Sequence, residues 1–182
     1  GCIKIKCHLL IITANNDINV TGMGYYGNNK YNQGKGKHEM AYAGYGTNGN
    51  GSDGGNIYGD EQLTVLFHGS GSIDNEAYLY PNGFGGGIIE IHCTKFINFG
   101  KVTSDGFRFG SGGSIFIMTK EFTNYGQIFA TGNLNTNYKI GAGRIAIYYD
   151  KCFNKGDILP KPYEGSCNDG INIVNKRIND VV

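Results

Sequence analysis

One stretch of this chain repeats without a gap, and the repeat limits the possible folds more than any other feature. Residues 86–106, GGIIEIHCTKFINFGKVTSDG, align with residues 112–132, GGSIFIMTKEFTNYGQIFATG, at a constant offset of 26. A third copy, AGRIAIYYDKCFNKGDI at 142–158, follows at an offset of 30. A looser copy lies at 8–24, where Val20 is expected to match Val102. Periods of about 20–50 residues are typical of stacked repeat architectures. The copies therefore predict segments that lie side by side in space.

Each copy reads as two short strands joined by a corner. In the first strand Ile89 and Ile91 alternate with Glu90 and His92, which is the two-residue period of a strand. No segment has a clear helical period, and glycine, at 31 of 182 residues, fills the gaps between strands. We therefore predict an all-β chain folded as a right-handed parallel β-helix, a solenoid, with a Gly/Tyr/Asn-rich insertion.

Stacking of the copies predicts columns of like residues. Inside the solenoid we expect aliphatic and aromatic columns, which would supply most of the folding free energy through burial. The Asn-x-Gly corner predicts a ladder of amides that bond the copies above and below, followed by glycines with positive φ. A column of alternating charge satisfies the rule for cross-strand pairs. The columns are Ile89/Ile115/Ile145, Ile91/Ile117/Ile147, Phe96/Phe122/Cys152, Asn98/Asn124/Asn154, Gly100/Gly126/Gly156 and Lys95/Glu121/Lys151.

The chain divides into four parts within a single domain at 1–182. The first coil is expected at 8–24, a Gly-rich insertion at 25–85, three regular coils at 86–158, and a cap or tail at 159–182. Inside the insertion, EQLTVLF at 61–67 predicts a strand. Phe116, Met118 and Tyr148 fall on the outward column and need a cover. We expect the insertion to provide it, or failing that a neighbouring chain.

Charge and hydropathy narrow the range of partners. The net charge is +1 and the basic residues are scattered, so neither nucleic acid nor an acidic membrane surface is an expected partner. No run of about 18 apolar residues occurs, so no membrane span is expected. Self-association, other surface proteins and carbohydrate remain as possible partners.

Cysteines and sequons bear on the compartment. The five cysteines are an odd number, and the absence of a C-x-x-C pair argues against structural zinc. Cys152 and Cys167 enclose a modest loop and are the candidate disulfide. Asn19 and Asn50 each begin an N-x-Ser/Thr sequon and are candidate glycosylation sites, which favours a secretory route.

Motifs for cofactors and catalysis are weak. GYGTNG at 44–49 fits G-x-G-x-x-G but lacks the strand and helix that a nucleotide site needs. NGNGSD at 48–53 approaches a calcium nonapeptide, and Asp53 with Asp60 could ligate Ca²⁺; a solvated turn is the simpler interpretation. No two carboxylates align on the outward columns, so we expect no catalytic residue and no cofactor beyond a possible Ca²⁺.

Several glycine motifs carry a resemblance to a known group. These are YGD at 58–60, GSGS at 69–72, GGGIIEI at 85–91, GSGGSIFI at 110–117 and GAGRIAIYY at 141–149. Over about 8–150 the chain resembles glycine-rich parallel β-helix repeat proteins of large secreted or cell-surface proteins, although Asn, Tyr and Lys replace many of the usual glycines. The resemblance implies a surface setting and no reaction.

These observations favour a non-enzymatic structural or adhesive module, outside the cell or on a cell or particle surface. A subunit of a filament or other surface assembly is one form of that role, since open ends suit head-to-tail contacts. The alternative is a carbohydrate-binding or polysaccharide-cleaving protein.

Overall fold

A computed structural model shows two parallel β-sheets and one helix. The structure describes residues 1–27, 45–47, 55–72, 83–132 and 140–179. The larger sheet has seven strands, in the order β1-β4-β6-β8-β11, with β2 paired to β4 and β9 paired to β6. The smaller sheet has four strands, in the order β10-β7-β5-β3. The elements are β1 (Cys2–Lys6), β2 (Leu9–Ile12), β3 (Asp17–Asn19), β4 (Ile88–Asn98), β5 (Lys101–Thr103), β6 (Ser114–Asn124), β7 (Gln127–Phe129), β8 (Arg144–Tyr148), β9 (Lys151–Asn154), β10 (Asp157–Leu159), β11 (Tyr163–Gly165) and α1 (Cys167–Asn179).

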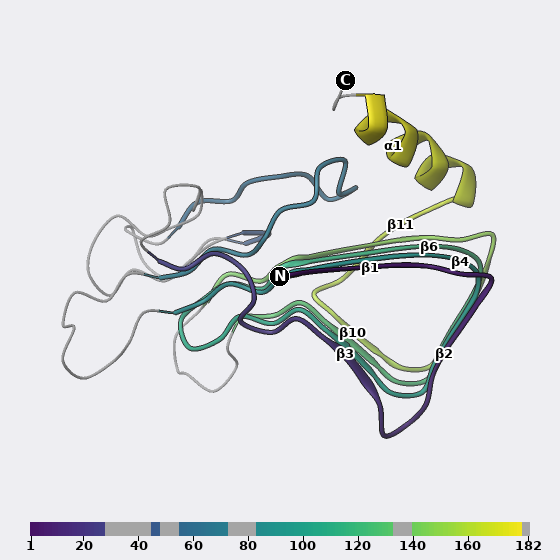
Figure 1. Cartoon of the computed structure of the whole chain (residues 1–182), viewed down its shortest axis with the longest axis horizontal. Helices are drawn as coiled ribbons and strands as arrows, with labels where there is room; N and C mark the ends of the chain where they lie inside the picture. Colours follow the sequence, from purple (N-terminus) through teal and green to yellow (C-terminus); the bar gives the residue numbers. More distant parts are fainter. Residues whose placement is uncertain (28–44, 48–54, 73–82, 133–139, 180–182) are drawn as a thin grey trace.

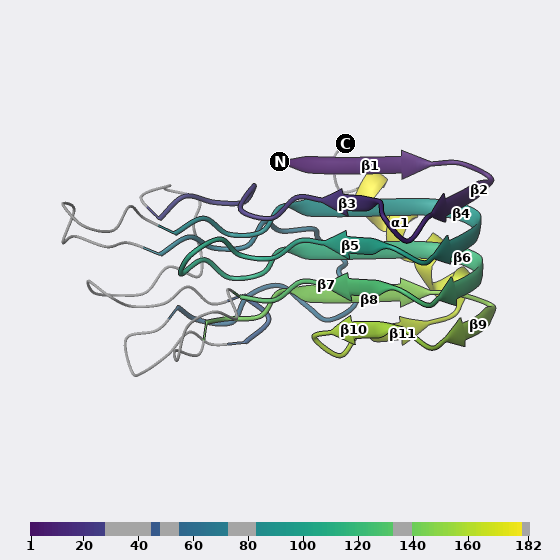
Figure 2. The same cartoon turned by 90° about the horizontal axis from the view of Figure 1, so that it is seen from below.

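The strands lie in four rows that follow the sequence repeat. Row 1 holds β1, β2 and β3, row 2 holds β4 and β5, row 3 holds β6 and β7, and row 4 holds β8, β9 and β10; β11 pairs with β8 beyond row 4. Figure 1 is viewed along the direction in which the rows are stacked, so that β1, β4 and β6 overlie one another on one side. Figure 2 shows β3, β5, β7 and β10 side by side in the smaller sheet.

The predicted columns are confirmed by the strand register. Ile89 pairs with Ile115, which pairs with Ile145, and the other aliphatic, aromatic and charged columns align in the same way. The members of the Ile91, Ile117 and Ile147 column are at most 1% exposed. Burial of one such side chain contributes about 1.5–3 kcal/mol, so these columns are the main source of stability.

The predicted fold class is wrong. We expected an all-β solenoid, a right-handed parallel β-helix, but the chain forms two separate, rather flat parallel sheets of seven and four strands and ends in a helix of 13 residues. A repeat offset determines which strands become neighbours. It does not determine whether the hydrogen-bonded ladders run on from one strand of a copy to the next. Here the larger ladder stops at the Asn-x-Gly corner, and a second ladder begins after it.

Local predictions at the start of the chain and in the insertion also need correction. The first row begins at Cys2 rather than at residue 8, and Ile18, not Val20, pairs with Val102. Residues 61–67 form turns and irregular structure instead of a strand, because Asp60 accepts hydrogen bonds from the backbone and hydroxyl of Thr64 and closes a local turn.

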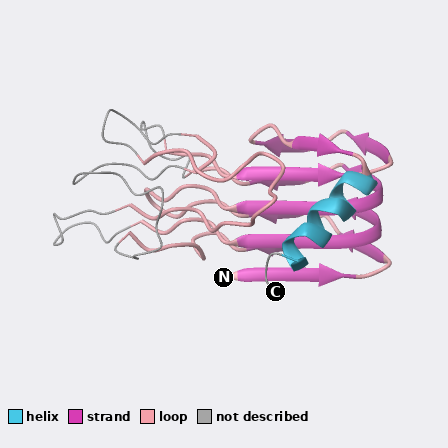
Figure 3. Cartoon of the chain, turned by 90° about the horizontal axis from the view of Figure 1, so that it is seen from above, coloured by secondary structure: helices cyan, strands magenta, loops and turns pink. Residues whose placement is uncertain are grey.

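The tail forms a helix because its first turn carries a capping box. The Ser166 hydroxyl accepts a hydrogen bond from the Asp169 backbone N–H, and the Asp169 carboxylate accepts one from the Ser166 backbone N–H. Ile173 and Val174 then turn toward the outer face of the larger sheet. Figure 3 shows α1 lying across the strands of that sheet.

The outer face of the larger sheet is covered by the insertion and by α1. Phe116 and Tyr148 are fully buried together with Tyr45 and Leu63 of the insertion, and the side chains of α1 pack on the same cluster. The predicted cover by the insertion is therefore confirmed, and α1 completes it.

Candidate functional site

A ladder of asparagines holds the corner where rows 2, 3 and 4 leave the larger sheet. The side-chain amide of Asn98 donates to Asn124 Oδ1 at 2.8 Å, and that of Asn124 donates to Asn154 Oδ1 at 2.9 Å. Asn98 and Asn154 also accept hydrogen bonds from the backbone N–H groups of Gly100 and Gly156, at 3.0 and 3.1 Å. Asn98 and Asn124 are fully buried, so these bonds replace water that the corner excludes.

The corner glycines are required by close approach rather than by positive φ. We predicted positive φ at Gly100, Gly126 and Gly156, but the described glycines with positive φ are Gly22 and Gly59. A Cβ on Gly126 would lie 2.1 Å from the carbonyl oxygen of Gly100, and one on Gly156 would lie 2.1 Å from that of Gly126. The rows therefore touch backbone to backbone here, which excludes any side chain.

Five exposed apolar side chains run across the rows on the side of the molecule that carries β2 and β9. Each is between 43% and 49% exposed, although strand residues of this type usually face a core. Two lie on β2, two occupy the middle position of the Asn-x-Gly corner, and one lies on β9. We name this set the contact stripe: Leu9, Ile11, Phe99, Tyr125 and Phe153.

The rings of the contact stripe expose their edges. The Phe99 and Tyr125 rings are 5.1 Å apart between centroids and only 5° from parallel, so each covers a face of the other. Phe153 is 5.4 Å from Tyr125 and tilted by 51°. A sugar that stacks on an aromatic platform needs a free ring face. The ring edges at Phe99 and Tyr125 instead suit apolar and aromatic protein groups.

A column of alternating charge runs beside the contact stripe. Lys95 Nζ lies 3.3 Å from Glu121 Oε2, and Lys151 Nζ lies 3.9 Å from Glu121 Oε1. All three side chains are well exposed, so the pairs add at most about 1 kcal/mol each to stability. Together they give this side of the molecule a positive, a negative and a positive charge in rows 2, 3 and 4.

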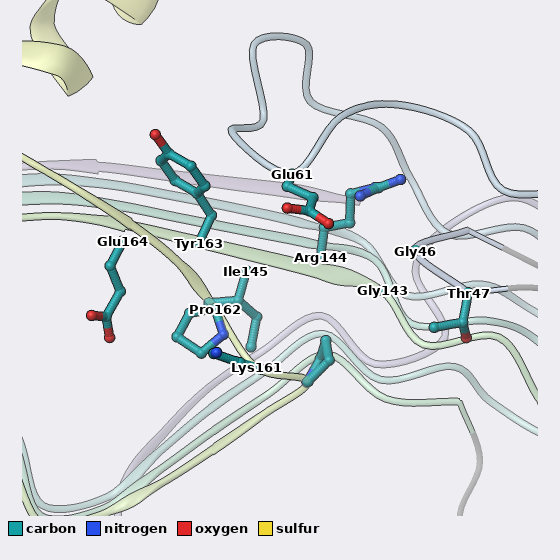
Figure 4. Close-up of a pocket in the computed structure, with 11 residues that line it drawn as sticks. Gly46, Thr47, Glu61, Gly143, Arg144, Ile145, Lys161, Pro162, Tyr163 and Glu164 are labelled. Atoms are coloured by element: carbon teal, nitrogen blue, oxygen red, sulfur yellow. The ribbon is translucent and has the colours of Figure 1, made fainter.

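A pocket of about 650 Å³ lies at the far end of the rows, next to β11. Figure 4 shows Tyr163, Glu61 and Arg144 around it, with the carboxyl of Glu164 pointing away from Arg144. Arg144 donates two hydrogen bonds to the carbonyl oxygen of Tyr58, at 2.9 and 3.2 Å. A backbone group of the insertion therefore fixes the position of its guanidinium group. We name this the end pocket.

Glu164 sits at an unusual place in the register. It pairs with Ile147 and so continues the inward column of Ile91 and Ile117 with a carboxylate. The Tyr149 hydroxyl donates to Glu164 at 2.9 Å. Burial and the neighbouring carboxylate raise the pKa of Tyr149, which keeps this hydroxyl a donor at neutral pH. An inward-pointing charge at the last strand discourages further strand pairing.

A buried ionic cluster links the larger sheet to α1. The Glu90 carboxylate is within 2.8 Å of both Lys4 Nζ and His92 Nε2, and within 3.1 Å of Arg177 Nη1. Arg177 also lies over the Phe116 ring at 4.3 Å and donates to the carbonyls of residues 63 and 64.

The charges around Glu90 determine its protonation. Burial by itself would raise the pKa of Glu90, but hydrogen bonds and charges from His92 and Lys4 outweigh burial and lower this pKa to about 2. Burial lowers the pKa of Arg177, and Glu90 opposes that effect. A cavity of about 530 Å³ opens beside this cluster, between the insertion and α1. Because its carboxylate is ionised and already has three partners, Glu90 fits an anchor for α1 better than an acid or base.

Of the candidate metal and glycosylation residues, the structure describes Asp60 and Asn19. The Asp60 carboxylate accepts hydrogen bonds from the backbone N–H and the hydroxyl of Thr64. Within the described ranges, no group of three or more His, Cys, Asp or Glu side chains is placed to hold a metal ion. Asn19 is exposed beside β5, where its side chain accepts from the Thr21 backbone. Asp53 and Asn50 lie outside the described residues.

The expected disulfide does not form. All five cysteines are free; Cys152 is exposed on β9, whereas Cys167 is buried at the first turn of α1. Strands β10 and β11 lie between these two cysteines in the chain.

Two features of the site were missed by our reading of the sequence. Phe99 and Tyr125 occupy the middle position of the Asn-x-Gly corner. Their shared aromatic character was the sequence signal that could have predicted an exposed aromatic pair. The contact of Arg177 with Glu90 joins residues 87 positions apart and has no local signal.

Comparisons leave the chain without a family. No protein-family model, curated protein or solved structure matches it. The resemblance to glycine-rich repeat proteins therefore stays a prediction. In the part of the chain that the structure describes, no helix is long and apolar enough to cross a membrane.

Proposed function

We propose that this protein is a non-enzymatic structural or adhesive module, working outside the cell or on a cell or particle surface, that holds its partner through the contact stripe. The observation that supports this most is the line of five apolar side chains, each exposed by more than two fifths, on a rigid frame of paired strands. Aligned apolar groups on a surface are typical of contact sites, and aromatic residues are enriched there.

The frame suits a mechanical role. Strand β4 pairs with β6 over Ile88–Cys93 and again over Lys95–Asn98, and the buried amide ladder locks the corner that carries Phe99 and Tyr125. The stripe is therefore held in a fixed geometry, which lowers the entropic cost of binding.

The register argues for contact along the side rather than end to end. If a second copy continued the rows beyond β11, Glu164 would fall beside Ile5 of that copy, because both belong to one inward column. By the same reasoning Asp157 would fall beside Asp17. A charge over an apolar core residue and a like-charge pair both oppose that arrangement.

Adhesion is tested with beads coated with the protein. We expect wild-type beads to clump, and beads that carry Phe99→Ser, Tyr125→Ser and Phe153→Ser together to stay dispersed. The matched control replaces three exposed apolar residues elsewhere, Ile57, Ile171 and Ile178, with serine.

The readout separates adhesion through the stripe from general stickiness. Control beads are expected to clump like the wild type. Dispersed wild-type beads, or equal clumping of the stripe variant and the wild type, would refute the proposal.

A carbohydrate ligand is the second candidate, and the end pocket favours it. The pocket brings a tyrosine, Tyr163, together with the carboxylates and cations that surround it, which can hydrogen-bond to hydroxyl groups. Calorimetry with soluble acidic and neutral oligosaccharides tests this candidate. We expect any heat of binding to vanish in Tyr163→Ala and to persist in the stripe variant.

A further inference from the structure

We infer that the partner held by the contact stripe is a second copy of this chain, related to the first by a two-fold axis that passes between β4 and β6. This inference rests on the proposed function and names the partner for the same surface. It is carried by the sign pattern of the charged column and by the order of apolar residues in the stripe.

A two-fold axis at this place reverses the order of the rows. Row 2 of one copy then faces row 3 of the other, and row 1 faces row 4. Lys95 lies in row 2 and Glu121 in row 3, and the register places them in one column. Each Lys95 therefore faces the Glu121 of the second copy, and the two new contacts are both between opposite charges.

The alternative side-by-side arrangement, with both copies pointing the same way, lacks this match. It would place Lys95 opposite Lys95 and Glu121 opposite Glu121, with Lys151 opposite Lys151. Like charges brought together at an interface cost binding free energy, and this cost selects the orientation.

The apolar residues obey the same two-fold operation. Phe99 in row 2 meets Tyr125 in row 3 of the second copy, and Ile11 in row 1 meets Phe153 in row 4. Leu9 meets Lys151, whose aliphatic stem can cover it while the ammonium group stays in water. Four of the five members of the contact stripe then face another member, and Leu9 faces the aliphatic stem of a lysine, as a self-complementary surface requires.

The half-exposed rings are suited to this packing. The Phe99 and Tyr125 rings present edges, and the tilted ring of Phe153 presents part of its face. Edge-to-face contacts between aromatic rings are favourable beyond the area that they bury.

Charge reversal tests the orientation as well as the partner. We compare wild type, Lys95→Glu, Glu121→Lys and the double variant by sedimentation equilibrium at low salt. Each single reversal creates like-charge contacts across the two-fold axis, so we expect the dimer Kd to rise about tenfold or more. The double variant restores opposite charges, and its Kd should return to within about threefold of the wild type.

Mixing provides an independent check. Lys95→Glu carries two glutamates at these positions and Glu121→Lys carries two lysines, so an equimolar mixture should associate more tightly than either variant alone. Thermal melting confirms that each variant is folded, since the intramolecular pairs that change are exposed and weak.

The outcomes distinguish this inference from the proposed function. A monomeric wild type at all concentrations, single reversals with no effect, or a double variant that does not recover would each overturn the two-fold dimer. If bead clumping still depended on Phe99, Tyr125 and Phe153 in that case, the adhesive function would stand, with the copies meeting in another arrangement than this two-fold dimer. If clumping did not depend on them, both would fall.

Discussion

Replacing the middle asparagine of the ladder should cost far more stability than replacing the last one. Asn124 is fully buried and bonded to both neighbours, whereas Asn154 is exposed. Asn124→Ala removes two side-chain hydrogen bonds worth about 1 kcal/mol each, and it also leaves the buried Asn98 amide without its short-range acceptor, at a further cost of about 1–3 kcal/mol. We expect a total loss of about 3–5 kcal/mol.

Urea unfolding, followed by circular dichroism, measures this difference. Asn154→Ala loses its bonds from Asn124 and from the Gly156 backbone, but at a position that water can reach, so its unfolding free energy should fall by no more than about 1–2 kcal/mol. With a slope of about 1–3 kcal/mol per M for small proteins, the Asn124→Ala midpoint should drop by at least about 1 M. Equal midpoints for the two variants would show that the ladder does not carry the corner's stability.

Further perturbations test the core, the ionic cluster and the corner. Ile117→Asp should abolish cooperative unfolding, because it buries an unpaired charge in the column of Ile91, Ile117 and Ile147. The control Thr123→Asp places the charge on the outward side and should melt close to the wild type. A normal melt for Ile117→Asp would refute the assignment of this column to the core. The pKa of Glu90 in the folded protein is lowered to about 2, so the carboxylate stabilises the fold fully above its ordinary pKa of 4.5. This stabilisation of about 3 kcal/mol is lost as the pH falls from about 4.5 to 2. Glu90→Gln should therefore flatten this part of the curve of unfolding free energy against pH. Gly126→Ala should lower the thermal midpoint sharply, since its Cβ would lie 2.1 Å from the Gly100 carbonyl oxygen; an unchanged midpoint would mean that the rows can separate there.

Sequence reasoning succeeded where one copy of the repeat lies directly against the next. In-register parallel pairing puts equivalent residues side by side, so Ile89 with Ile115 and Lys95 with Glu121 could be predicted from the offset alone. It failed at the first row, where Ile18 rather than Val20 pairs with Val102, because the match there is short and loose.

The overall architecture depended on information that the offset does not contain. Equivalent residues are neighbours whether the strands close into one coil or divide between two sheets, so the fold class could not be read from the columns. The helix had a local signal in Ser166 and Asp169, but its docking depends on Arg177 reaching Glu90 and on the insertion leaving room beside it. Such contacts arise only when distant segments are assembled.

The constant spacing between rows makes the molecule extensible from within. Residues 86–111 form a unit of 26 positions whose two borders are compatible with each other, because residue 112 follows it with the same backbone pairing that residue 86 has. A tandem duplication of this segment would add one row and lengthen the protein by about 4.8 Å. It would do so without disturbing the specialised first and last strands. Gain or loss of such a unit would therefore change the length of the stack while the pairing register at its two borders stays the same.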